Sequence, residues 1–140
     1  MLTRTRTVYT EFKHSQPGLP SWHSCQHYHG HSTDVIVQIQ WPGDEASVEQ
    51  IGVFETAVRD LDARIRSIHL NEVSTNPNPE AQELAEIAHG ILAERLPDDL
   101  TDGVTVYVNH ALLRIPRRWP PAAPGEPVPL PAGYTPHWQH

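Results

Sequence analysis

Residues 33–41 read Thr-Asp-Val-Ile-Val-Gln-Ile-Gln-Trp, and this stretch sets the fold class of the 140-residue chain. Apolar residues alternate along it, as in a β-strand with one buried face. The residues on that face are Val35, Val37, Ile39 and Trp41. Pro42-Gly43-Asp44 then ends the strand. Upstream, Thr5 to Phe12 alternates more loosely in β-favouring residues, which predicts a second strand.

Two helices are predicted downstream. The first begins at the capping box of residues 47–50, and apolar residues follow at helical spacing from Ile51 to Ile68. Asn78 as N-cap and Pro79 at the first helical position predict the start of the second helix. The second helix carries an apolar stripe of Leu84, Ala85, Ala88, Ile91, Leu92 and Leu96. A polar loop is expected over 71–78, and a last strand is expected from Val104 up to Ile115.

The order strand, strand, helix, helix, strand predicts an α+β domain over residues 1–115, with an antiparallel sheet and two helices on one face. From residue 116 the chain becomes a Pro-rich C-terminal extension, 116–140, with eight prolines in its 25 residues. Such a segment favours extended polyproline II structure. It is either a disordered tail or an ordered strap, for which Trp119, Tyr134 and Trp138 are the candidate anchors.

Composition excludes several classes of protein. The formal net charge of −7, with Lys13 as the single lysine, argues against a nucleic-acid partner. No segment approaches the roughly 20 apolar residues of a membrane span, and the N-terminus lacks the apolar stretch of a signal peptide. The single cysteine excludes an internal disulfide and suits a reducing compartment. We therefore expect a cytoplasmic protein with a thin monomeric core, for which assembly is plausible.

The histidine pattern indicates a metal site. Residues 25–31 read Cys-Gln-His-Tyr-His-Gly-His, and in an extended chain His29 and His31 project from the same face. His14 offers a third nitrogen. Three histidines with an open fourth position are typical of a catalytic zinc site. The alternative is a chance His-x-His pair on the surface, in a chain with ten histidines.

Three motifs, Phe12-Lys13-His14, His23-Ser24-Cys25 and His29-Gly30-His31, resemble the 6-pyruvoyl-tetrahydropterin synthase family, which includes the 6-carboxy-tetrahydropterin synthases. The resemblance implies a tunnelling-fold architecture, Zn²⁺ bound by the three motif histidines (14, 29 and 31), and Cys25 as the catalytic acid/base. It also implies a homotrimer or homohexamer, in which sheets close into a barrel and active sites lie at subunit interfaces.

The chain departs from the family before Leu70-Asn71. The family carries an Asp-His pair there, whereas the ungapped positions of this chain hold Arg66 and Ser67. With a two-residue deletion, His69 takes the place of the family histidine, although no aspartate precedes it. His69 is therefore a candidate catalytic acid/base. The alternative is a helix-terminal histidine that the helix dipole favours.

The last strand departs as well. The family places a glutamate there that grips the pterin ring, whereas this chain has Asn109-His110. These two residues are candidates for binding a different polar group of a small-molecule substrate, and the alternative is an ordinary strand end. The sequence thus predicts a zinc-dependent lyase or cyclase acting on a small oxygenated metabolite other than a pterin. Specialised metabolism is the expected setting for such an enzyme. Two alternatives stay open: a genuine synthase acting on dihydroneopterin triphosphate, and a catalytically silent homologue that binds a metal or a partner.

Overall fold

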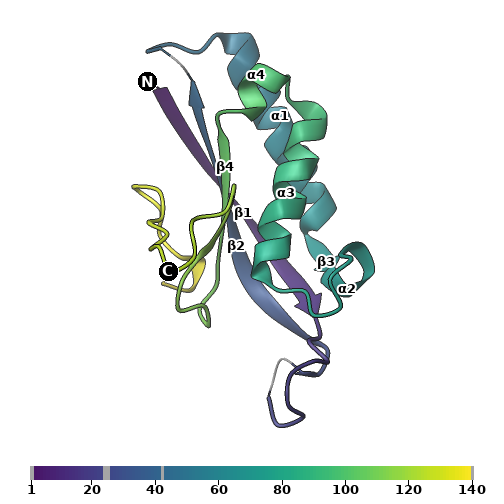
Figure 1. The fold of residues 1–140 in the computed structure, drawn as a ribbon. Helices are drawn as coiled ribbons and strands as arrows, with labels where there is room; N and C mark the ends of the chain where they lie inside the picture. Colours follow the sequence, from purple (N-terminus) through teal and green to yellow (C-terminus); the bar gives the residue numbers. More distant parts are fainter. Residues whose placement is uncertain (1, 24–25, 42, 140) are drawn as a thin grey trace.

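The computed structural model of the chain describes residues 2–23, 26–41 and 43–139. Its elements are β1 (Leu2–His14), β2 (His29–Trp41), α1 (Val48–Ile65), β3 (Ser67–His69), α2 (Leu70–Val73), α3 (Ala81–Arg95), α4 (Asp98–Thr101), β4 (Val104–Asn109) and β5 (Arg117–Trp119), followed by a 3₁₀ turn over His137–Gln139. The strands form one sheet in the order β3-β1-β2-β4-β5. Both long helices, α1 and α3, cover the same face of this sheet (Figure 1). The predicted α+β class, with helices on one face, is confirmed.

The sheet is built on a long antiparallel ladder between β1 and β2, which runs from Leu2 opposite Trp41 to His14 opposite His29. β4 pairs antiparallel with β2, and β5 with β4. The short β3 instead pairs parallel with β1, so the sheet is mixed rather than wholly antiparallel. The end of α1 explains this pairing. The Ile65 carbonyl accepts a hydrogen bond from the Thr10 hydroxyl, and the residues that follow Ile65 therefore lie along the end of β1.

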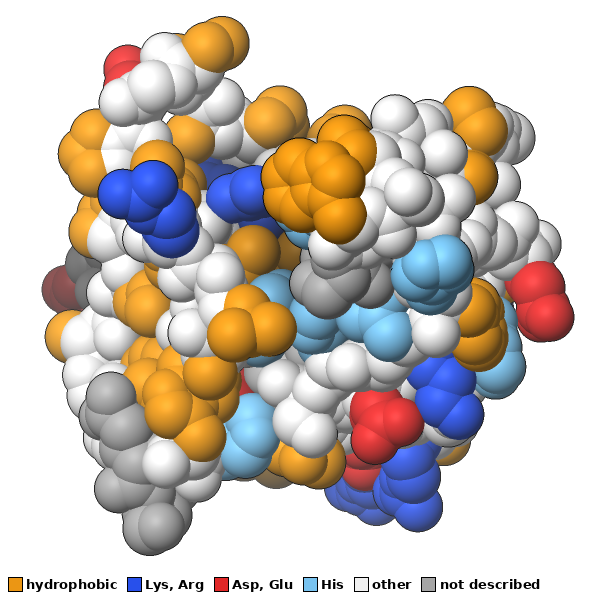
Figure 2. Space-filling view, turned by 90° about the horizontal axis from the view of Figure 1, so that it is seen from below, with side chains coloured by type: hydrophobic (Ala, Val, Ile, Leu, Met, Phe, Trp, Pro, Cys, Tyr) orange, Lys and Arg blue, Asp and Glu red, His pale blue; other side chains and the backbone are white. Residues whose placement is uncertain are grey.

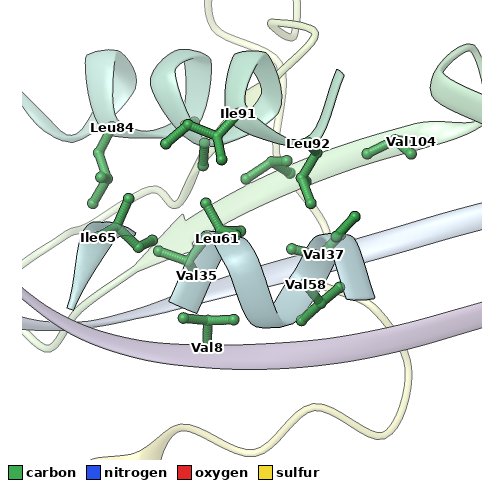
Figure 3. Packing of buried hydrophobic residues seen from close by; sticks show 14 of the residues in the cluster. Val8, Val35, Val37, Val58, Leu61, Ile65, Leu84, Ile91, Leu92 and Val104 are labelled. Atoms are coloured by element: carbon green, nitrogen blue, oxygen red, sulfur yellow. The ribbon is translucent and has the colours of Figure 1, made fainter. Parts of the chain in front are cut away.

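The core lies between the sheet and the two helices, as the sequence pattern predicts. Phe54, Leu61 and Ile65 of α1 are fully buried against the strands. The six residues of the α3 stripe predicted from sequence are also buried. Figure 3 shows the side chains of both helices directed at the valines of β1, β2 and β4. Among the described residues, no helix is long and apolar enough to cross a membrane.

Several local boundaries differ from the sequence prediction. The first helix is predicted to reach Ile68, but α1 ends at Ile65 and Ile68 lies in β3. Helix α3 begins at Ala81, with Glu80 and not Asn78 as its N-cap. The reason is that the Asn78 carboxamide oxygen accepts a hydrogen bond from the Gly18 N–H instead (2.6 Å). Part of the expected polar loop forms the short α2. The last strand ends at Asn109, and the chain then returns as β5, which lies beyond the predicted domain boundary at residue 115.

Residues 120–139, here called the C-terminal strap, run over the face of the sheet that the helices leave open (Figure 1). Asp34 of β2 is 1% exposed and holds the strap in place. Its carboxylate accepts hydrogen bonds from the Tyr134 hydroxyl, from the His137 N–H (3.1 Å) and from His137 Nδ1 (2.7 Å). The His137 ring also packs edge-on against Tyr9 of β1, with ring centroids 4.4 Å apart. The fully buried Ile36 lies on β2 two residues after Asp34, on the same side.

Candidate metal centre

Three histidines converge at one end of the β1–β2 ladder. His14 ends β1, and His29 and His31 begin β2. Because His14 lies directly opposite His29, and His31 follows two residues later, all three side chains lie on the helix-covered face. Their Nε2 atoms are 3.0 Å (14 to 29), 2.8 Å (29 to 31) and 3.1 Å (31 to 14) apart. The sequence prediction that these three residues come together is therefore met by the geometry.

Hydrogen bonds to the second ring nitrogens fix the form of two of these imidazoles. His14 Nδ1 lies 2.6 Å from the carbonyl oxygen of Pro79, and His29 Nδ1 lies 2.6 Å from that of His27. A carbonyl oxygen only accepts, so each Nδ1 carries the proton and donates. The Nε2 atoms of both rings then present lone pairs to each other, which is unfavourable unless a cation lies between them. Metal-ligating histidines typically donate their other ring N–H to a carbonyl or carboxylate oxygen in this way.

The spacing also fits a tetrahedral metal ion. Zn–N bonds of about 2.0–2.1 Å at tetrahedral angles place ligand nitrogens about 3.3 Å apart, so the triangle opens by only about 0.2–0.5 Å to hold zinc. Burial, with a smaller contribution from neighbouring imidazoles, lowers the pKa of His14 and lowers that of His31 to about 4. The lowered pKa favours the neutral form of His14 and His31, which is the form that binds a metal.

Two members of the triad, His14 and His31, line a cavity of about 300 Å³. Its walls include Phe12, Glu80, His110 and Arg117 as well as His14 and His31. His110 is 6% exposed, and its ring stacks on that of His31 at a centroid distance of 4.6 Å. Figure 2 shows histidine side chains gathered on this end of the molecule, with hydrophobic side chains around them. A small ligand in this cavity would lie beside His14 and His31.

The two candidate substrate residues lie apart. His110 lines the cavity, whereas Asn109 lies on the strap side of the sheet, where its amide nitrogen is 3.5 Å from the Tyr134 hydroxyl. Successive residues at a strand end point to opposite faces, which separates this pair. Only His110 is therefore placed to meet a ligand beside the triad.

His69 lies at the end of β3 and is not among the residues that line the triad cavity. Its Nδ1 is hydrogen bonded to the hydroxyl of Tyr28, and the two rings are nearly parallel with centroids 5.7 Å apart. It also borders a separate cavity of about 520 Å³ between α1, α2 and α3. Tyr28 directly precedes His29, so this contact connects His69 to the start of β2. Cys25 lies outside the described residues.

Two residues of the site were missed by the sequence reasoning. Glu80 borders the cavity from the N-terminus of α3, and Arg117 borders it from β5. Neither residue lies at a sequence distance from the histidines that is typical of a metal-site motif. For Glu80, an acidic residue just before a helical stripe was an available signal. For Arg117, which lies in the Pro-rich extension, the sequence offers none.

Comparisons with known proteins agree with this geometry. A family model described as 6-pyruvoyl tetrahydropterin synthase matches residues 5–112, which include the whole triad. The fold is similar to the structure of Caenorhabditis elegans 6-pyruvoyl tetrahydropterin synthase, with a TM-score of 0.62 and 12% identity over 79% of this chain and 89% of that one. It is also similar to an uncharacterized protein from Wolinella succinogenes, with a TM-score of 0.50 and 12% identity over 84% and 96% of the two chains. No curated protein matches the sequence.

Proposed function

The chain belongs to the 6-pyruvoyl tetrahydropterin synthase family, and on this premise we propose that it is a zinc-dependent lyase or cyclase acting on a small oxygenated metabolite. The convergence of three imidazole Nε2 atoms beside a cavity is the observation that carries the proposal. A zinc ion with three neutral ligands would supply Lewis-acid chemistry, polarising a carbonyl or hydroxyl oxygen. Polarisation of this kind acidifies the neighbouring C–H bond, which is the step that an elimination or cyclisation requires.

The residues around the triad have separate proposed roles. The carbonyl groups of Pro79 and His27 orient two of the ligands, and His110 holds the third by stacking. Cys25 is the proposed acid/base, because it occupies the cysteine position of the family motif and a thiol near a metal has a lowered pKa. His69 is the proposed second acid/base, with the Tyr28 hydroxyl as its partner.

Metal content tests this proposal directly. We expect about one zinc per chain in purified, dialysed protein by elemental analysis, and we expect His29→Ala to lose most of it. The matched control is His27→Ala, because His27 contributes only its backbone carbonyl to the site and its side chain is exposed. Equal zinc in both variants would contradict the assigned ligand set, whereas zinc-free wild-type protein would favour the catalytically silent alternative.

The proposed substrate is not a pterin. Pterin recognition uses a carboxylate to accept parallel charge-assisted hydrogen bonds, and this chain has Asn109-His110 where the family places its glutamate. Among the described residues that line the cavity, Glu80 is the one carboxylate, and it pairs with Arg117. Zinc-loaded protein incubated with dihydroneopterin triphosphate should therefore form little 6-substituted tetrahydropterin. Turnover on the order of 1 s⁻¹ or faster would restore the pterin synthase alternative.

Assembly into a homotrimer or homohexamer is part of the proposal. In the described part of the chain, β3 pairs only with residues 11–13 of β1, and β5 only with residues 106–108 of β4. Most of β1 therefore borders an open sheet edge, and such edges are favourable places for strands of another subunit to pair. Light scattering at micromolar concentration should give a multiple of the 15.8 kDa chain mass, and a monomer mass would contradict the assembly.

A further inference from the structure

Arg117 lies on the same side of the sheet as the histidine triad. In the β4–β5 ladder it is opposite Val108, whose side chain is in the core beneath the helices. Paired residues share a face, so the Arg117 side chain is on the helix-covered face. The next residue, Arg118, is opposite Tyr107 and therefore on the other face. The ladder thus separates two adjacent arginines, only one of which lines the cavity.

The structure holds the Arg117 guanidinium in a fixed place. Its Nε donates to a carboxylate oxygen of Glu80 (3.2 Å), and its Nη1 donates to the Ile115 carbonyl (2.5 Å). The backbone beside it is also fixed, because the Gln82 side chain of α3 donates to the Arg118 carbonyl (2.7 Å). A guanidinium placed in this way loses little conformational freedom when it binds a ligand.

The chemistry of this group indicates the kind of ligand. A guanidinium has five N–H donors in a plane, and the two bonds described above use one donor each. Paired N–H groups of arginine match the oxygens of a carboxylate or a phosphate. Among the described residues lining the cavity, Glu80 and Arg117 are the acidic and basic side chains other than histidine, and their charges offset each other. A divalent ion held by neutral ligands would then leave the cavity net positive.

We propose that Arg117 binds the oxyanion, a carboxylate or a phosphate, of a small substrate whose hydroxyl or carbonyl end meets the histidine triad. The cavity of about 300 Å³ is at the small end of the range for ligand sites, which fits a molecule of a few carbon atoms. This inference deepens the proposed function and rests on it only for the position of the reacting end. Arg117 lies outside the residues 5–112 that the family model matches.

Binding of matched probes tests the inference without an activity assay. Lactate and lactamide share a skeleton and a hydroxyl group and differ in charge. We expect wild-type protein to bind lactate about ten- to a hundredfold more tightly than lactamide by calorimetry at low salt, because hydrogen bonds to a charged group are the stronger ones. Arg117→Gln should remove this preference. Arg118→Gln, the control on the opposite face, should retain it.

Inorganic phosphate is the third probe, and its affinity relative to lactate identifies which oxyanion the site prefers. Each titration is run on zinc-free and zinc-loaded protein, so loss of zinc binding, which would contradict the proposed function, is read separately from loss of anion selection. The inference is overturned if wild type shows no preference, if Arg117→Gln keeps it, or if Arg118→Gln loses it as well. If circular dichroism shows that Arg117→Gln is unfolded, Arg117→Lys replaces it as the test. A weaker preference for lactate in Arg117→Lys supports binding through paired N–H groups, and an unchanged preference overturns the inference.

Discussion

The substitution Asp34→Asn tests whether the C-terminal strap stabilises the fold. Asp34 is buried, and its carboxylate accepts three hydrogen bonds from two strap residues, Tyr134 and His137. Asparagine has nearly the same shape, but it carries one acceptor oxygen in place of two and no charge. At least one strap donor therefore loses its acceptor, and the remaining bonds lose their charge assistance.

The expected cost follows from these bonds. A hydrogen bond to a charged group contributes about 1.5–3 kcal/mol, and His137 is partly exposed, so its share is reduced by solvent screening. We expect Asp34→Asn to lower the free energy of unfolding by about 2–3 kcal/mol and Tyr134→Phe by about 1–2 kcal/mol. Because the two side chains interact directly, the double variant should cost less than the sum, with a coupling energy of about 1 kcal/mol.

Urea denaturation of the four proteins in this cycle measures the coupling. Limited chymotrypsin digestion gives a second measurement, since release of the strap should expose Tyr134 to cleavage, which mass spectrometry detects. Asp102→Asn is the control, because this aspartate is exposed. A coupling energy of zero, together with a strap in Asp34→Asn that resists chymotrypsin as well as in wild type, would refute the role given to Asp34.

Two further predictions concern acid sensitivity and backbone packing. Burial lowers the pKa of His110 to about 4, so between pH 6.5 and 4 the unfolded chain binds a proton that the folded chain excludes, and stability falls with the pH. Zinc-free protein should thus lose about 2 kcal/mol of unfolding free energy from pH 7 to pH 5 through this residue. His110→Phe should make the profile measured by urea denaturation less steep, and His31, whose pKa is also lowered to about 4, should supply part of the slope that stays. An equally steep profile in His110→Phe would contradict this. Gly103→Ala should destabilise the fold by about 1–3 kcal/mol in urea denaturation, because its Cβ would collide with the Gln40 carbonyl oxygen. Gly90→Ala in α3, with open space at its Cβ, should stabilise the fold slightly in the same measurement. The reverse order of the two glycine variants would exclude this explanation.

The sequence predicts the main elements because β2, α1 and α3 carry clear periodic patterns, and β1 a looser one. Alternation in β2 and the helical stripes of α1 and α3 place the core correctly. The short β3 escapes prediction because three residues carry no period, and its pairing depends on the bond from Thr10 to Ile65. Likewise, Asn78-Pro79 has good capping chemistry, but a partner distant in sequence, Gly18, takes the asparagine side chain.

The candidate site likewise contains residues that the sequence predicts and residues that it does not. The pair His29 and His31 can be read from its spacing, and the family motif supplies His14. The carbonyl of Pro79 and the guanidinium of Arg117 cannot be read from spacing, because tertiary packing alone brings them to the triad. The separation of Asn109 from His110 was accessible in principle, since neighbouring residues of a strand alternate between faces.

The placement of the triad on two strands makes metal loading a measure of sheet alignment. His14 meets His29 across the β1–β2 ladder only in the native pairing, and a slip of one residue would turn one of them to the opposite face. The other end of the same ladder, Leu2 opposite Trp41, lies about 40 Å away at about 3.4 Å per residue. An ion at one end would therefore discriminate against misaligned chains along the whole length. A residue inserted in the connection over 15–28 leaves this alignment intact, whereas one inserted within either strand disrupts it.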